Sequence, residues 1–249
     1  MMNNIYLNVH SIDSFGTHDG PGIRLVVFLQ GCNLKCKYCQ NPDSISKKET
    51  SKFISVNEIL KRARRMKPYF KNGGGVTLSG GEPMLQSKEI IALFDKLKKY
   101  DIHTNIDTNG TVITKDAQLL IRTQADLIMF DVKHTNNMGF SSLTGANRFT
   151  NLLKNVQLRE ESKKPYWLRY VLVPGYTDSD ESLYRLIDLF SNKNYLEKLE
   201  ILPYHKLGMH KWEMLNWEYE LTDVEENTPE QLERVDSILN KHFKNLSIR

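Results

Sequence analysis

The stretch RLVVFLQGCNLKCKYCQN, residues 24–41, joins an apolar run to a loop that holds all three cysteines of the chain. Cys32, Cys36 and Cys39 follow a Cys-x3-Cys-x2-Cys spacing, and such a dense group of thiols is typical of a metal site. The run before them, Arg24–Gln30, is almost continuously apolar, as parallel strands covered on both faces are. The stretch therefore predicts a buried strand followed by a metal-binding loop.

The number of thiols limits the kind of metal centre. A fully ligated iron–sulfur cubane takes four thiolates, so three would leave one iron open to a substrate. A structural zinc site with three cysteines and one histidine has the same thiol count. His18, His103 and His205 are the candidates for its fourth ligand. The spacing alone leaves both centres open.

The composition is that of an ordinary soluble globular protein. The 249 residues are 40% hydrophobic and 26% charged, and the net charge of +4 is too small to imply nucleic acid. The N-terminal segment has no signal-peptide pattern, and no apolar run is long enough to cross a membrane. An odd number of clustered cysteines argues against disulfides and for a reducing cytoplasm. We expect a cytoplasmic protein with neither a membrane nor a nucleic-acid partner.

Short apolar runs alternate with amphipathic stretches along the chain. The predicted strands are Arg24–Gln30, Gly75–Leu78, Ile102–Thr108, Leu127–Val132, Tyr166–Val173 and Leu199–Tyr204. The predicted helices are Ser55–Met66, Ser87–Tyr100, Asp178–Phe190 and Pro229–Phe243. The alternation predicts an α/β fold, a single domain over residues 1–249 with its core at about 14–245, built as a partial (β/α)6 TIM-type barrel of parallel strands. In that architecture the chemistry lies where strands end.

Three further motifs follow predicted strands. Ser79–Pro83, SGGEP, has glycines that let the backbone approach a ligand closely, although Gly-Gly and Glu-Pro also mark turns. Asp107–Gly110, DTNG, and Met129–Lys133, MFDVK, end the next two strands. Their two carboxylates and one hydroxyl are oxygen ligands suited to a hard cation, or they shape turns.

A longer pattern runs through the cysteine loop and its flanks. It consists of Gly20, Gly22, Arg24, Phe28, Gly31, Cys32, Lys35, Cys36, Cys39 and Asn41. This pattern resembles the signature of the glycyl-radical-enzyme activases, a branch of the radical S-adenosylmethionine (SAM) family. Residues 14–24, 170–176, 202–205 and 208–212 resemble the same family. Many of those activases carry a ferredoxin-like insert with additional cysteines, whereas this chain has only enough for one cluster.

The resemblance implies an oxidoreductase of anaerobic glucose metabolism. It implies that Cys32, Cys36 and Cys39 hold one [4Fe-4S] cluster whose open iron binds SAM. Reductive cleavage of SAM would give methionine and a 5′-deoxyadenosyl radical, which removes a hydrogen atom from a glycine Cα. The expected protein substrate is pyruvate formate-lyase. Alternatives are another glycyl radical enzyme, a radical SAM reaction on a small molecule, or a non-catalytic zinc module.

The resemblance also assigns individual residues. The implied SAM contacts are Tyr38, Cys39, Gln40, Gly81, Asp131, Val132, Lys133 and His205. The implied ligands of a monovalent cation, Na⁺ or K⁺, are Asp107, Thr108, the Met129 backbone and Asp131. Asp19 is the expected anchor for the substrate glycine loop. Gln40 and His18 depart from the histidine and valine that are usual in the family, so details of peptide orientation stay open.

A basic run occupies Lys61–Lys67. It indicates either a solvated helix face or a docking patch for an acidic electron donor such as flavodoxin. The acidic segment from Glu213 to Glu233 is interpreted as a solvated surface. We expect a monomer.

Overall fold

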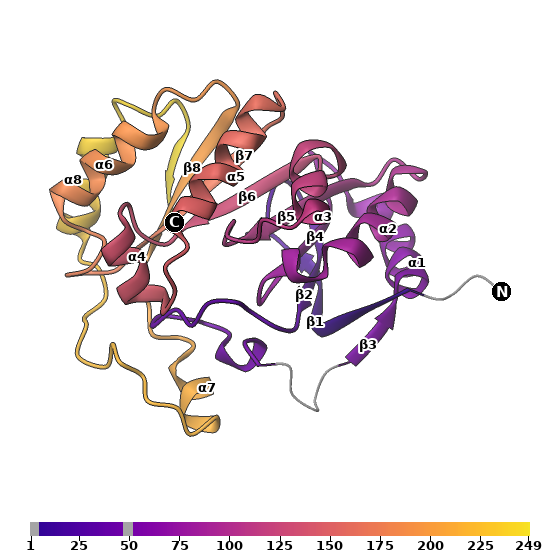
Figure 1. The fold of residues 1–249 in the computed structure, drawn as a ribbon, viewed down its shortest axis with the longest axis horizontal. Coiled ribbons are helices and arrows are strands. Elements are labelled where there is room, and N and C mark those ends of the chain that lie inside the picture. Colours follow the sequence, from indigo (N-terminus) through magenta and orange to yellow (C-terminus); the bar gives the residue numbers. More distant parts are fainter. Residues whose placement is uncertain (1–4, 47–51) are drawn as a thin grey trace. The chain divides into compact units, whose positions relative to one another are not determined.

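The computed structural model describes residues 5–46 and 52–249, and the chain divides into two compact units. Unit 1 comprises residues 1–33 and 44–129, and unit 2 comprises residues 34–43 and 130–249. The boundary falls within strand β6 (Leu127–Val132) and within the cysteine loop, after Asn33. Figure 1 follows the chain through both units.

Unit 1 holds the first part of a mostly parallel sheet. Its strands, in the order β3-β1-β2-β4-β5-β6, lead up to the boundary. β1 pairs antiparallel with β2 and β3, whereas β2, β4 and β5 are parallel. The bounds are β1 (Tyr6–Gly16), β2 (Arg24–Leu29), β3 (Lys52–Ser55), β4 (Gly75–Gly80) and β5 (His103–Thr108).

Helices α1 (Val56–Met66) and α2 (Ser87–Lys98) lie side by side along these strands (Figure 1). The Ser55 hydroxyl caps α1 by accepting the Glu58 N–H, as the sequence predicts. Apolar residues at helical spacing on both helices are buried, which fixes the face that each turns to the sheet. The remaining elements are η1 (Pro42–Ser44), η2 (Lys67–Tyr69), η3 (Pro83–Gln86), α3 (Lys115–Leu119) and the π-helical η4 (Leu120–Gln124).

Unit 2 continues the sheet in the order β6-β7-β8-β9, with β7, β8 and β9 parallel. Thr228 and Gln231 form a capping box that starts its last helix. The strands are β7 (Tyr166–Leu172), β8 (Leu196–Pro203) and β9 (Leu246–Ile248). The helices are α4 (Asn137–Thr144), α5 (Phe149–Glu161), α6 (Asp180–Phe190), α7 (Met209–Met214) and α8 (Pro229–Leu239).

The α/β class and the mostly parallel sheet are confirmed. All six predicted strands are present, within three residues of their expected ends. β3 ends the strand order in unit 1 and β9 ends it in unit 2, so the sheet is not closed. The sequence reading missed β1, β3 and β9. No helix in the described ranges combines the length and the apolar character that a bilayer crossing requires.

Candidate functional site

The cysteine loop begins in unit 1, directly after β2. The Gly31 N–H donates to the Ser44 carbonyl at 2.7 Å, and the Cys32 N–H donates to the Ile45 carbonyl at 3.0 Å. Gly31 has a φ of +100°, which favours glycine. Backbone bonds therefore fix the point at which Cys32 leaves the strand.

The SGGEP turn packs against this point. A Cβ on Gly81 would lie 2.2 Å from the Gly31 carbonyl oxygen, so only glycine fits there. The Gly81 N–H donates to Leu29 O at 2.9 Å, which leaves its carbonyl as the group that could receive an ammonium. The fully buried Glu82 carboxylate accepts the Thr108 hydroxyl at 2.6 Å and the Asn109 N–H at 2.8 Å. Glu82 thus ties the end of β5 to the turn.

The predicted cation ligands divide between the units. Asp107, Thr108 and Met129 belong to unit 1, and Asp131 belongs to unit 2. The Asp107 carboxylate accepts the Ser79 hydroxyl at 2.9 Å. The Thr108 hydroxyl, which donates to Glu82, also accepts the Gly110 N–H at 3.0 Å. Hydrogen bonds therefore hold the Asp107 carboxylate and the Thr108 hydroxyl in place, and the Thr108 hydroxyl is largely engaged within the protein.

Asp19 lies in a loop of unit 1 that a buried arginine supports. Its backbone carbonyl accepts the Thr77 hydroxyl at 2.7 Å and the Asn105 amide at 3.0 Å. The fully buried Arg24 donates from Nε to the same Thr77 hydroxyl at 2.9 Å. His18 is exposed in this loop. The sequence reading used Arg24 only as part of a pattern, although a charged residue that starts an apolar strand signals a buried polar role.

Arg24 also contacts His103, one of the histidines considered for zinc. Arg24 Nη1 lies 3.3 Å from His103 Nδ1. Burial and the guanidinium charge lower the pKa of His103 to about 4, although Asp126 opposes the shift. His103 is therefore occupied by a structural contact within unit 1.

The second part of the cysteine loop lies in unit 2. The N–H groups of Lys35 and Lys37 donate to the carbonyls of Thr144 and Leu143, both at 2.9 Å, at the end of α4. Burial raises the pKa of the Cys36 thiol to about 12. In the metal-free protein Cys36 is thus a neutral thiol that must lose a proton when it binds a metal.

Tyr38, Lys133 and Asp131 lie together in unit 2. Lys133 Nζ is 2.7 Å from Asp131 Oδ2 and 5.7 Å from the centroid of the Tyr38 ring. Burial lowers the pKa of Lys133, but Asp131, Tyr38 and Cys36 together outweigh burial and raise that pKa well above its ordinary value. Tyr38 is 5% exposed, and its hydroxyl has no hydrogen-bond partner among the described residues. Val132, the remaining predicted contact on β6, is buried.

Gln40 and His205 meet in unit 2. Gln40 Nε2 donates to the His205 carbonyl at 3.0 Å, and Gln40 Oε1 accepts the Gly208 N–H at 2.7 Å. The Trp212 indole donates to the Cys39 carbonyl at 2.9 Å. His205 Nδ1 is buried and has no partner in the described part of the chain. The structure therefore brings together several predicted residues that are far apart in sequence.

The three thiols of the cysteine loop divide between the two units. Within residues 5–46 and 52–249, no three Cys, His, Asp or Glu side chains are grouped to hold a metal ion. Cys32 belongs to unit 1, and Cys36 and Cys39 belong to unit 2. All three are free of disulfides. Soft thiol donors suit an iron–sulfur cluster, and the unpartnered Tyr38 and His205 atoms with the Gly81 cradle suit a polar ligand. The residues therefore fit a cluster and SAM by their chemistry.

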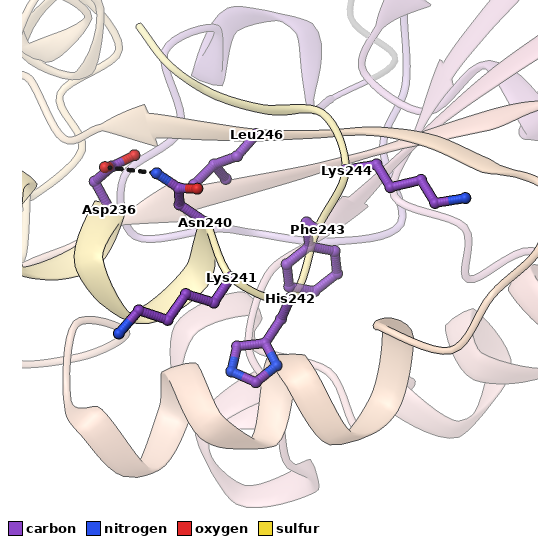
Figure 2. Close-up of a pocket in the computed structure, with 7 residues that line it drawn as sticks. All are labelled: Asp236, Asn240, Lys241, His242, Phe243, Lys244 and Leu246. Atoms are coloured by element: carbon purple, nitrogen blue, oxygen red, sulfur yellow. Dashed lines mark hydrogen bonds between the residues drawn. The ribbon is translucent and has the colours of Figure 1, made fainter.

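A pocket of about 350 Å³ lies elsewhere in unit 2, between the end of α8 and β9 (Figure 2). Asp236 and Asn240 form a hydrogen bond at one side of it, and Lys241, His242 and Lys244 also line it. It contains none of the residues predicted for the site.

The basic run lies on α1 and its end. Arg62 pairs with Glu58 at 2.6 Å, and the Arg64 guanidinium lies 4.3 Å from the Tyr100 ring centroid. Lys67 donates to the Tyr100 carbonyl at 2.5 Å. Much of this basic charge therefore has contacts within unit 1.

Comparison with known proteins agrees with the sequence pattern. Residues 26–187 match the model of the radical SAM superfamily. The chain is 43% identical over 224 residues to the pyruvate formate-lyase-activating enzyme of Staphylococcus aureus strain USA300, covering 88% of this chain and 89% of that protein.

Solved structures share the fold at lower identity. A domain of a pyruvate-formate lyase-activating enzyme from Bacteroides vulgatus superposes with a TM-score of 0.59 at 20% identity, over 71% of this chain and 99% of that one. Streptococcus suis SuiB, bound to its precursor peptide SuiA, gives 0.68 at 20% identity, over 96% and 50%. The chain belongs to the radical SAM superfamily and, within it, to the family of pyruvate formate-lyase-activating enzymes.

Proposed function

We propose that this chain is an oxidoreductase that activates pyruvate formate-lyase by generating a glycyl radical in it. The observation that carries the proposal is the 43% identity to a curated activating enzyme over 88% of the chain. The superfamily match, residues 26–187, spans all three cysteines and the SGGEP turn. Both parts of the expected chemistry, a cluster loop and a SAM loop, therefore lie inside the matched region.

Cys32, Cys36 and Cys39 are proposed to hold one [4Fe-4S] cluster with an iron left for SAM. When bound, the cluster and SAM supply a one-electron cleavage of the sulfonium and the removal of a hydrogen atom from glycine. Burial of Cys36 supports this role, because a shielded ligand keeps water away from the cluster. Backbone hydrogen bonds of Gly31 and Lys35 hold the start and the middle of the loop.

The SAM contacts are proposed from the Gly81 backbone and from the Tyr38, His205 and Lys133 side chains. The Gly81 carbonyl can accept the amino group, since the Gly81 N–H is already bound to Leu29. The Tyr38 ring can pack against the adenine, and His205 Nδ1 can accept or donate a hydrogen bond. Lys133, which follows Val132, supplies a cation beside Asp131.

A Na⁺ or K⁺ ion is proposed to lie at Asp107, Thr108, the Met129 carbonyl and Asp131. Hard oxygen donors support this assignment. Asp131 already pairs with Lys133, so a bound cation would share that carboxylate with the lysine. Such an ion would orient the SAM carboxylate electrostatically.

The protein partners are proposed from the family. Asp19 is the proposed anchor for the glycine loop of pyruvate formate-lyase, and its backbone is held by Thr77 and Asn105. An acidic flavodoxin-type donor is proposed to supply the electron by docking on α1. The enzyme is proposed to act as a cytoplasmic monomer in anaerobic glucose metabolism.

The test begins with protein reconstituted anaerobically with iron and sulfide. With a reductant, SAM and inactive pyruvate formate-lyase, we expect 5′-deoxyadenosine to form and the lyase to become active. If 5′-deoxyadenosine forms but the lyase stays inactive, the substrate is another glycyl radical enzyme or a small molecule. A colourless protein that retains zinc after reconstitution would contradict the cluster assignment.

A further inference from the structure

The Gln40 carboxamide makes three hydrogen bonds to backbone groups of unit 2. Its Nε2 donates to the Tyr38 carbonyl at 3.2 Å and to the His205 carbonyl at 3.0 Å. Its Oε1 accepts the Gly208 N–H at 2.7 Å. Both amide hydrogens and one oxygen lone pair are therefore engaged. We call these three hydrogen bonds the Gln40 bridge.

The backbone around the bridge is closely packed. A Cβ on Gly208 would lie 2.7 Å from the Gln40 Cα and 2.9 Å from the Gln40 carbonyl oxygen. Gly208 has a φ of −83°, so contact with Gln40, and not backbone conformation, is what requires glycine there. Lys211 Nζ also donates to Asn41 Oδ1 at 2.6 Å. The start of α7 is thus held directly against the end of the cysteine loop.

We propose that Gln40 is a positioning residue that sets the affinity for SAM by joining the cysteine loop to the segment that carries His205. The inference rests on the proposed function, in which Cys39, next to Gln40 in sequence, binds the cluster and His205, bound to Gln40 through its carbonyl, contacts SAM. His205 is held through its backbone, so its ring nitrogen Nδ1 is left for a ligand. Both amide hydrogens of Gln40 are used within the protein, so its part in SAM binding is to position the loop and His205.

The bridge needs the two donors and one acceptor that a primary amide offers. Glutamate keeps the size and the acceptor but would place carboxylate oxygen against two carbonyl oxygens. Methionine keeps the length and provides no donor. A neutral histidine offers one donor and one acceptor, which is one donor too few. Gln40→Glu therefore removes the two donated hydrogen bonds and keeps the accepted one, whereas Gln40→Met removes all three.

The first measurement is the Kd for SAM in the reconstituted enzyme. It is obtained by titrating SAM and recording the change in the electron paramagnetic resonance spectrum of the reduced cluster. We expect Gln40→Met and Gln40→Glu to load iron as the wild type does. We expect their Kd for SAM to rise about tenfold, the equivalent of one or two lost hydrogen bonds. The KM for pyruvate formate-lyase at saturating SAM should stay unchanged. Met214→Gln, an exposed change on α7, is the matched control and should leave the Kd unchanged.

The second measurement uses the metal-free protein and follows hydrogen exchange of the Gly208 amide. Exchange should accelerate in Gln40→Met and stay slow in Gln40→Glu, which keeps an acceptor oxygen. Gly208→Ala tests the same contact from its other side and should also raise the Kd for SAM. An unchanged Kd in Gln40→Met and Gly208→Ala, with active wild type, overturns the inference and leaves the proposed function intact. If the wild type binds no SAM, the proposed function is wrong instead.

Discussion

Replacing Arg24 by methionine would remove a buried guanidinium that ties three segments of unit 1 together. Its Nη1 donates to the Gly73 carbonyl at 2.7 Å, and its Nη2 donates to the Val76 carbonyl at 2.7 Å. Its Nε donates to the Thr77 hydroxyl, which in turn donates to the Asp19 carbonyl. Methionine fills the space of the stem but removes the arginine donor from the Gly73 and Val76 carbonyls and leaves the Thr77 hydroxyl only the 3.4 Å hydrogen bond from the Asn105 amide.

The magnitude follows from two opposing effects. Hydrogen bonds from a charged donor contribute about 1.5–3 kcal/mol each, and Arg24 makes three at 2.7–2.9 Å. Burial opposes them, because it lowers the pKa of Arg24 to about 9. Each buried acceptor that loses its donor costs about 1–3 kcal/mol, so we expect Arg24→Met to lower the free energy of unfolding by about 3–5 kcal/mol. For a chain of 249 residues that loss corresponds to a fall in Tm on the order of 10 °C.

Urea unfolding of the metal-free protein, followed by circular dichroism, measures the loss. Arg24→Lys keeps the charge with fewer donors and should lose less than Arg24→Met. Arg62→Met, at an exposed ion pair on α1, is the control and should change the free energy of unfolding by no more than about 0.5 kcal/mol. Because the Asp19 loop depends on Arg24, the KM for pyruvate formate-lyase should also rise while SAM binding is kept. A loss below about 1 kcal/mol in Arg24→Met would refute the reasoning.

Three other predictions concern unit 1 and the cysteine loop. The folded pKa of His103, about 4, lies below its ordinary value of 6.5, so the free energy of unfolding should fall as pH drops from about 6.5 to about 4. His103→Gln should flatten that slope in urea titrations at stepped pH; an equal slope in the variant would exclude His103 as its source. Glu82→Gln places an amide N–H against the Thr108 hydroxyl donor or the Asn109 N–H donor and should lower the free energy of unfolding by about 2–3 kcal/mol in urea titrations. An unchanged free energy of unfolding would contradict the assignment of Glu82 as a buried carboxylate acceptor. Cys36→Ala should reduce the iron content and the brown colour to background, and a variant that cleaves SAM at the normal rate would remove Cys36 from the ligand set.

The strands that the sequence predicted are those with both faces buried. Their residues form continuous apolar runs, as in Leu127–Val132, and such runs are readable locally. β1 was missed because most of its polar and aromatic side chains are exposed, so no apolar run marks it. β9 has only three residues and depends on pairing with β8. Tertiary pairing, which local sequence does not encode, decides both.

Some parts of the candidate site could be predicted from local sequence, and others depend on tertiary contacts. Local sequence predicts the cysteines, the SGGEP turn and the strand-end carboxylates, because each motif ends or directly follows a predicted strand. The contact between Gln40 and Gly208 joins residues 168 positions apart, and no local pattern predicts it. The sequence predicts a SAM contact at Gln40, and it could not show that the Gln40 side chain also bonds to backbone groups of unit 2. The role of a side chain such as that of Gln40 depends on which backbone groups the fold places near it.

The most direct test of the central claim is an electron paramagnetic resonance spectrum of pyruvate formate-lyase after anaerobic incubation with the reduced, reconstituted protein and SAM. We expect a glycyl doublet on the lyase that requires SAM and disappears when the target glycine of the lyase is replaced by alanine. If no glycyl signal appears while the cluster is intact and reduced, the claim that this chain activates pyruvate formate-lyase is contradicted.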